Sequence, residues 1–276
     1  MVAFNKRYSR DKHTVNEKKG KKNILSNILL VICIVVFCYS AYMLIKSGLD
    51  TYKSKKENDK VADIFYGPIQ TPTTTKEPEL TPTPTPEPET LEQKFARLTA
   101  INPDIKAWIN IANTNIDYAV VQASDNDYYL RRSIYKKYSY SGSIFMDYRC
   151  SIWDKATTNV IIYGHNMKAD NMFHQLEKYR KKDFFNNENN IITLYTSEGT
   201  ITARVFSVYI TDTGFNYLQT SFSKSEGYRN YLDSIISKSL FTSSVNVSTD
   251  DRIITLSTCD YDFEDARLVI HAKIIQ

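Results

Sequence analysis

The chain has 276 residues, of which 42% are hydrophobic, 13% aromatic and 24% charged, and its formal net charge is +4. This composition is sufficient for a folded core. Residues 1–23 contain eight basic and two acidic residues, so the positive charge belongs to this terminal segment, and no basic patch with interleaved aromatic residues indicates a nucleic-acid partner.

An uncharged apolar stretch, residues 24–45, follows the basic segment. It has the length that a helix needs to cross a bilayer. A cleaved signal peptide would have a shorter apolar core followed by a small-residue cleavage site, which is not seen here. The positive-inside rule leaves residues 1–23 in the cytoplasm, although five lysines after the span weaken the asymmetry. We therefore expect a cytoplasmic tail (1–23), a single-pass anchor in the cell membrane (24–45) and an extracellular remainder.

The next segment, residues 46–90, is expected to be an extracellular stalk rich in Pro, Thr and Glu. Seven of the eight prolines lie between Pro68 and Pro88. Alternating Thr-Pro and Glu-Pro pairs exclude helix and sheet and favour an extended chain. At about 3.1 Å per residue, roughly 20 such residues would hold a folded domain on the order of 60 Å above the membrane.

A folded domain is predicted over residues 91–276. Thr90 and Gln93 match a capping box, and apolar residues then recur at helical spacing, so a helix begins at Leu91. Pro103 is expected to open a second short helix, 103–109. Short β-rich runs follow at 116–122, 143–147, 159–163, 191–196, 200–210, 252–259 and 267–275, interrupted by helical patterns at 172–179 and 224–239. The pattern predicts a mostly β domain.

Two of the four cysteines, Cys33 and Cys38, lie in the apolar stretch, where packing explains them. Cys150 and Cys259 lie in the extracellular part, where a disulfide is permitted. Nothing in their spacing indicates a pair, so a Cys150–Cys259 bridge stays an alternative.

Strand parity gives a more specific interpretation of Cys259. Side chains alternate along 252–259, so Cys259 shares the more polar face with Ser257. If this strand pairs with 267–275 through the loop 260–266, Cys259 and Arg267 lie at adjoining strand ends on a face outside the core. A nearby cation lowers a thiol's pKa and stabilises the thiolate that attacks.

Acyl transfer by a thiol also needs a proton donor for the leaving amine, for which histidine is suited. His13 lies in the tail, His174 is expected on a helix surface, and His271 is expected to face solvent. His165 follows an apolar strand and a glycine, and so lies on a loop beyond a rigid element, where catalytic groups concentrate. The alternative interpretation is a small core cysteine and a solvated histidine.

Several motifs together resemble the class B sortases of Gram-positive bacteria over residues 91–276. They are TLSTC at 255–259, Arg267 eight residues later, YGHNM at 163–167, INIANTNIDYAVVQASDNDYYL at 109–130 and GSIFMD at 142–147. The resemblance implies a sortase-like β-barrel with N-terminal helices and a helix before the cysteine strand. It also implies that Cys259 is the nucleophile, His165 the general acid and base, and Arg267 the group that stabilises the substrate or oxyanion, with Ser257 a fourth member. Ala119 stands where relatives often have proline.

The resemblance implies a membrane-anchored cysteine transpeptidase. Such an enzyme cleaves a C-terminal sorting signal of secreted proteins through a thioacyl intermediate and transfers them to a peptidoglycan amine, with no metal or cofactor; a monomer is assumed. The rival interpretations are a membrane-tethered cysteine peptidase, an L,D-transpeptidase and a non-catalytic wall-facing binding module. Signatures of papain-like peptidases and of L,D-transpeptidases are not found around Cys259.

Overall fold

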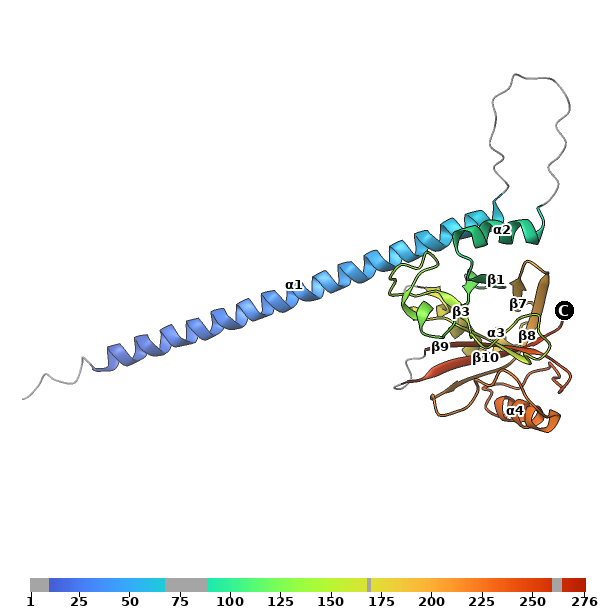
Figure 1. Cartoon of the computed structure of the whole chain (residues 1–276). Coiled ribbons are helices and arrows are strands. Elements are labelled where there is room, and N and C mark those ends of the chain that lie inside the picture. The colour runs from blue at the N-terminus through green and yellow to red at the C-terminus, as the bar shows by residue number, and fades with distance from the viewer. Residues whose placement is uncertain (1–9, 68–88, 168–169, 260–264) are drawn as a thin grey trace, which may run out of the picture. The chain divides into compact units, whose positions relative to one another are not determined.

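The computed structural model of the chain describes residues 10–67, 89–167, 170–259 and 265–276 (Figure 1). The chain divides into two compact units, Met1–Leu49 and Asp50–Gln276. Helix α1 (Arg10–Tyr66) begins in the first unit and ends in the second. Among the described residues it is the one helix long and apolar enough to cross a membrane. Its large apolar side chains between Ile28 and Ile45 are exposed, as a helix surrounded by lipid requires.

The C-terminal part of α1 belongs to the second unit and packs there. Val61 and Phe65 are buried, and the Phe65 ring stacks on Trp108 with centroids 4.5 Å apart and an interplanar angle of 7°. The hydroxyl of Tyr66 donates a hydrogen bond to Asp117 at 2.8 Å. Residues 46–66 of the expected extended stalk are therefore helical. The physical reason is that the prolines that exclude a helix begin only at Pro68, while residues before them bury apolar side chains.

Helix α2 (Leu91–Ile101) begins where the capping box predicted, with the Thr90 and Gln93 side chains each bonded to the other's backbone N–H. From this helix, Nη2 of Arg97 donates to the carbonyl of Gly67 at 3.2 Å and to the Glu89 carboxylate at 2.5 Å. One guanidinium thus holds both chain ends that border residues 68–88. The proline-rich part of the expected stalk, 68–88, lies outside the described residues.

Eight strands of the described chain close into a barrel in the order β1-β2-β3-β4-β9-β10-β8-β7 (Figure 1). Their bounds are β1 Ile105–Ile111, β2 Asp117–Val121, β3 Ile144–Met146, β4 Asn159–Tyr163, β7 Ile191–Tyr195, β8 Thr200–Thr211, β9 Ile253–Cys259 and β10 Arg267–Ile274. The smaller elements are η1 Tyr128–Arg131, β5 Asn166–Met167, β6 Asn171–Met172, η2 His174–Arg180, α3 Lys182–Phe185 and α4 Ser225–Ser237. The predicted mostly β barrel, with a helix before the cysteine strand, is confirmed.

The short helix expected at 103–109 is wrong, because strand β1 occupies Ile105–Ile111. Ala107 and Ile109 point into the barrel core, whereas Ile105 and Trp108 pack under α1 and α2. The sequence Ile-Lys-Ala-Trp-Ile-Asn-Ile alternates as a strand does, with Lys106 exposed, and Trp108 is the buried exception on the second face. Pairing with β2 and β7 makes this segment a strand, although Pro103 before it is a helix-start signal.

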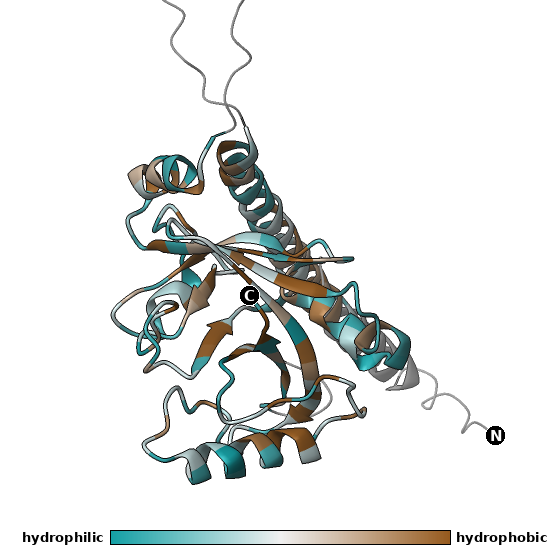
Figure 2. Cartoon of the chain, turned by 90° about the vertical axis from the view of Figure 1, so that its right-hand side faces the viewer, coloured by the Kyte–Doolittle hydropathy of each residue, from teal (hydrophilic) through white to brown (hydrophobic). Residues whose placement is uncertain are grey.

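The expectation that one face of β9 and β10 lies outside the core is also wrong. Leu256 and Ile270 face the barrel interior, while Ile253 and Val269 face a second apolar cluster beneath α4. Helix α4 was correctly predicted, and its alternating apolar and polar surface is visible in Figure 2. The strands that carry the TLSTC motif are therefore fixed from both sides.

His271, expected to face solvent, is fully buried in this second layer. Its Nδ1 lies 2.8 Å from the Thr255 hydroxyl, and its Nε2 lies 2.8 Å from the Tyr209 hydroxyl. The Thr255 hydroxyl donates to Asn159 at 2.6 Å, so it accepts from His271, and Tyr209 donates to the other ring nitrogen. These partners satisfy a neutral imidazole. Burial lowers the pKa of His271 to about 3.

We expect His271 to make the fold sensitive to acid. The unfolded imidazole binds a proton near pH 6.5 and the folded one only near pH 3, so the unfolded state holds more protons between these values. The free energy of unfolding should therefore fall on acidification, by up to about 1.4 kcal/mol per pH unit from this residue. Denaturant unfolding between pH 7 and pH 4 should show a shallower dependence in His271→Gln. An identical dependence in the two proteins would contradict the assignment.

Candidate active site

The ends of three neighbouring strands bring the predicted site residues together. Cys259 is the last residue of β9, and its Cα pairs with that of Arg267, the first residue of β10. On the other side of β9, the parallel strand β4 ends with Tyr163 opposite Ser257. The N–H of Gly164 donates to the carbonyl of Ser257 at 3.2 Å, so the chain leading to His165 continues beside the end of β9. The predicted pairing of β9 with β10 is confirmed.

A cavity of about 280 Å³ lies at these strand ends. Its lining includes His165, Arg267 and Ser257, three of the four predicted site residues. The remaining lining residues are Asn126, Leu130, Phe145, Tyr163, Gly164, Leu218 and Thr258. The backbone of Cys259 places it one residue beyond Thr258, while its side chain lies outside the described residues. The roles of all four residues stay predictions.

His165 is half-buried at the mouth of this cavity. Its Nε2 lies 2.8 Å from the carbonyl oxygen of Leu130, which can only accept, so Nε2 carries the proton. Burial lowers the pKa of His165, and the charge of Arg131 adds to this effect, while the bond to Leu130 acts in the opposite direction. The imidazole of the resting protein is therefore mainly neutral at pH 7.

Ser257 and Arg267 differ in how they are held. The Ser257 side chain is 3% exposed, and its hydroxyl lies 2.9 Å from that of Tyr217, a residue between β8 and α4. Arg267 is half-buried, and its Nη1 donates to the carbonyl of Ala266 at 3.0 Å. Ser257 thus connects β9 to a neighbouring segment, whereas the Arg267 guanidinium has, toward the described residues, donors that are not used and that a bound group could take.

Cys150 is unsuited to nucleophilic attack. It is 5% exposed and free, with its Sγ 3.5 Å from the Asn159 carbonyl oxygen and 3.4 Å from the backbone nitrogen of Ile161. Burial raises the pKa of this thiol to about 11, so it stays protonated at neutral pH. Cys150 contributes to the lining of a separate cavity of about 490 Å³ that contains none of the predicted site residues. The thiol that the strand geometry favours is that of Cys259.

Sequence reasoning missed several residues of the cavity. Asn126 and Leu130 come from the segment after β2, and Leu218 comes from the segment after β8. Their side chains carry no distinctive chemistry, and only the fold brings these loops beside β9. His174, expected on a surface, is instead half-buried and bonded to Asn166 at 2.7 Å. No group of three His, Cys, Asp or Glu residues arranged for a metal ion occurs in the described ranges.

Known proteins similar to this chain agree with the geometry. A sequence model of the sortase domain matches residues 109–275. Sortase B of Listeria monocytogenes is 36% identical over 264 residues, covering 92% of this chain and 98% of that protein. The crystal structure of Clostridium perfringens sortase B is 42% identical, with a TM-score of 0.63 over 66% of this chain and 100% of the other.

A structure described as a Staphylococcus aureus sortase B–substrate complex is 37% identical, with a TM-score of 0.64 over 68% of this chain and 87% of the other. Identity above 30% extends over nearly the whole length of the Listeria protein, and the same barrel recurs in the solved structures. The chain therefore belongs to the sortase family, and within it to the class B sortases, which are cysteine transpeptidases.

Proposed function

We propose that this chain is a membrane-anchored transpeptidase in which Cys259 is the nucleophile, His165 transfers protons and Arg267 stabilises negative charge. The observation that supports this most is the meeting of β4, β9 and β10 at one cavity, which His165 and Arg267 line. Its substrates are secreted proteins that carry a C-terminal sorting signal, and its acceptor is an amine of peptidoglycan.

In the first step the Cys259 thiolate attacks the carbonyl carbon of the Thr-X peptide bond of the sorting signal. The C–N bond breaks, and the leaving amine takes a proton from the His165 imidazolium. The guanidinium of Arg267, at the start of β10, offsets the negative charge that develops on the carbonyl oxygen. The product is a thioester between the threonine carbonyl and Cys259.

In the second step the acceptor amine attacks the thioester carbonyl. Neutral His165 accepts the amine proton, the C–S bond breaks, and the thiolate of Cys259 is restored. Because burial lowers the pKa of His165, its resting form is the one that this second step needs. The first step uses the smaller fraction of molecules in which His165 is protonated. Ser257 assists by holding the Tyr217 segment beside the end of β9.

The apolar part of α1 supports a reaction on the outer side of the cell membrane. Residues 24–45 anchor the chain in the cell membrane with residues 1–23 in the cytoplasm, so the catalytic domain faces the wall. Sorting signals and peptidoglycan amines are both present on that side. Residues 91–276 contain every residue assigned to the chemistry.

The full chain, purified in detergent, should join a peptide to an amine. It is incubated with a panel of sorting-signal peptides, either alone or with triglycine or diaminopimelate, and the products are identified by mass spectrometry. We expect an acyl adduct on Cys259, the free acid when no amine is present, and an amide when amine is added. A free acid alone under every condition would favour the tethered peptidase. Neither cleavage nor adduct across the panel would favour the binding module.

A further inference from the structure

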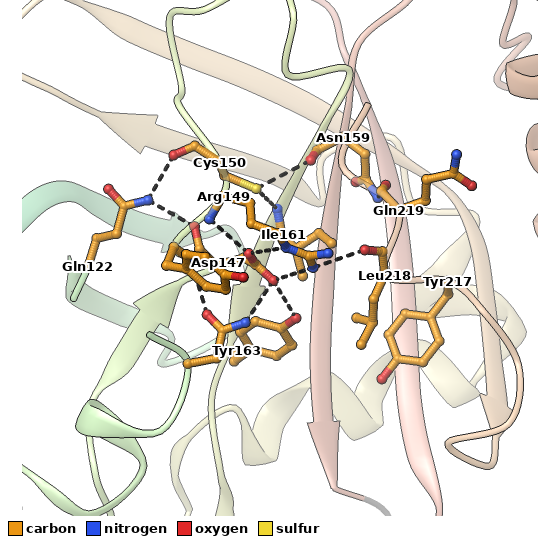
Figure 3. A network of polar contacts seen from close by, with 12 residues as sticks. Gln122, Asp147, Arg149, Cys150, Asn159, Ile161, Tyr163, Tyr217, Leu218 and Gln219 are labelled. Carbon is orange, nitrogen blue, oxygen red and sulfur yellow. Dashed lines mark hydrogen bonds and ion pairs between the residues drawn. The ribbon is translucent and has the colours of Figure 1, made fainter. Parts of the chain in front are cut away.

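A fully buried carboxylate lies behind the wall of the active-site cavity. Asp147, directly after β3, is 0% exposed, and Figure 3 shows its polar contacts. Its Oδ1 accepts from the backbone N–H of Arg149 at 3.0 Å and from Nε of the same residue at 2.8 Å. Its Oδ2 accepts from Nη2 of Arg149 at 2.7 Å, from the Tyr163 hydroxyl at 2.9 Å and from Nδ2 of Asn126 at 2.9 Å. Both oxygens are therefore fully used.

The hydrogen bonds of Asp147 and Arg149 connect three segments that line the cavity. Asn126 comes from the loop after β2 and Tyr163 from the end of β4, and both contact the carboxylate directly. Nη2 of Arg149 also donates to the carbonyl of Leu218 at 3.0 Å, in the segment between β8 and α4. Neither Asp147 nor Arg149 lines the cavity. One ion pair thus connects three cavity-lining segments that are distant in sequence.

The network is charged and tightly constrained. Burial by itself would raise the pKa of Asp147, but the hydrogen bonds from Arg149, Tyr163 and Asn126 outweigh it and hold this pKa below its usual range. The carboxylate stays ionised at neutral pH. A buried anion that accepts five hydrogen bonds fixes its donors in place, because each donor that moves removes a hydrogen bond from a charge that water cannot reach.

We propose that Asp147 is a positioning residue that, with Arg149, sets the shape of the peptide-binding cavity without contacting the reacting atoms. This inference rests on the proposed function, since it assigns the cavity to the sorting-signal peptide. His165, Cys259 and Arg267 are held by the strand ends of the barrel and by the Leu130 and Ala266 carbonyls. Removal of the carboxylate should therefore weaken peptide binding and leave the reactivity of the thiol unchanged.

Asp147→Asn tests this separation. The substitution keeps the size of the side chain but replaces one acceptor oxygen with an amide donor, so at least two of the five hydrogen bonds are lost. We expect Kd for a fluorescent sorting-signal peptide, measured by anisotropy in the full-length Cys259→Ala protein, to rise roughly 10- to 100-fold when Asp147→Asn is added. In the protein that retains Cys259, the rate and pH profile of its alkylation by iodoacetamide should stay the same.

A second variant covers the case in which Asp147→Asn does not fold. Arg149 is 40% exposed, and Arg149→Lys keeps the positive charge but cannot bond both carboxylate oxygens and the Leu218 carbonyl together. It should weaken peptide binding to a smaller extent. The matched control is Asp251→Asn, which removes a carboxylate paired with Lys273 at 3.0 Å and away from the cavity. This control should bind peptide normally.

Three results would overturn the proposal. They are an unchanged Kd in folded Asp147→Asn and Arg149→Lys proteins, an equal loss of binding in Asp251→Asn, and slower alkylation of Cys259 together with unchanged binding. The binding measurement needs no catalysis. A chain that binds peptide in an Asp147-dependent manner but never cleaves it would refute the proposed function and leave this inference standing.

Discussion

Cys259→Ala is expected to lower cleavage of sorting-signal peptides by roughly 10⁴-fold or more, because the group that forms the thioester is removed. The amide product and the acyl adduct should both disappear in mass spectra of the full chain. The fold should persist, because Cys259 is the terminal residue of β9, whose preceding residues are buried on both faces. Circular dichroism and thermal unfolding check that the protein remains folded.

Cys150→Ala is the matched control for this result. It removes the other cysteine of the catalytic unit, a buried core thiol whose hydrogen bonds within the described residues are to backbone atoms of β4. Cleavage should stay within about twofold of the unsubstituted rate, since the Cys150 side chain lines a different cavity and, in the described part of the chain, forms no hydrogen bond with the residues that line the proposed peptide site. Full activity in Cys259→Ala, or loss of activity in folded Cys150→Ala, would reverse the assignment of the nucleophile.

Phe65→Ala should detach the end of α1 from the catalytic unit. Phe65 is 2% exposed, stacks on Trp108, and has Nζ of Lys94 5.0 Å from its ring centroid. Loss of a buried phenylalanine costs about 3–5 kcal/mol, and this ring is the main contact of the end of α1 with Trp108. We expect amide exchange of residues 50–66 to accelerate strongly while the barrel strands stay protected.

Tyr52→Ala provides the comparison for Phe65→Ala. Tyr52 lies on the same part of α1 but is 67% exposed, so its removal should leave amide exchange unchanged. Slow exchange of residues 50–66 in Phe65→Ala would mean that the ring does not hold the helix to the unit.

The sequence predicts the elements whose signals are local. The capping box of Thr90 and Gln93 marks the start of α2, and the apolar face of residues 224–239 identifies α4. Sequence periodicity does not predict burial where other elements of the fold cover a residue. Trp108 of β1 is buried because α1 and α2 cover it, and His271 is buried because α4 and the segment before it cover the outer face of β10. Neither fact is visible in one strand's own residues.

The candidate site likewise contains some residues that the sequence identifies and others that only the fold identifies. Strand parity and loop position selected Cys259, His165 and Arg267, because the chemistry of each residue is unusual and each lies at a strand end. Asp147 gave no such signal, although it follows a strand directly. Its proposed role depends on five hydrogen-bond donor groups that belong to three residues. Two of these residues, Asn126 and Tyr163, come from separate parts of the chain. Such a network becomes visible only when those parts are placed together.

The contacts of Arg97 bear on whether residues 68–88 can act as a spacer. Gly67 and Glu89 meet the same guanidinium, so both residues that border 68–88 are held at the unit that begins at Asp50. The proposed anchor and the unit that begins at Asp50 are joined by only four residues, which extend at most about 14 Å. In the proposed topology, the length of residues 68–88 therefore does not set the spacing between the anchor and this unit.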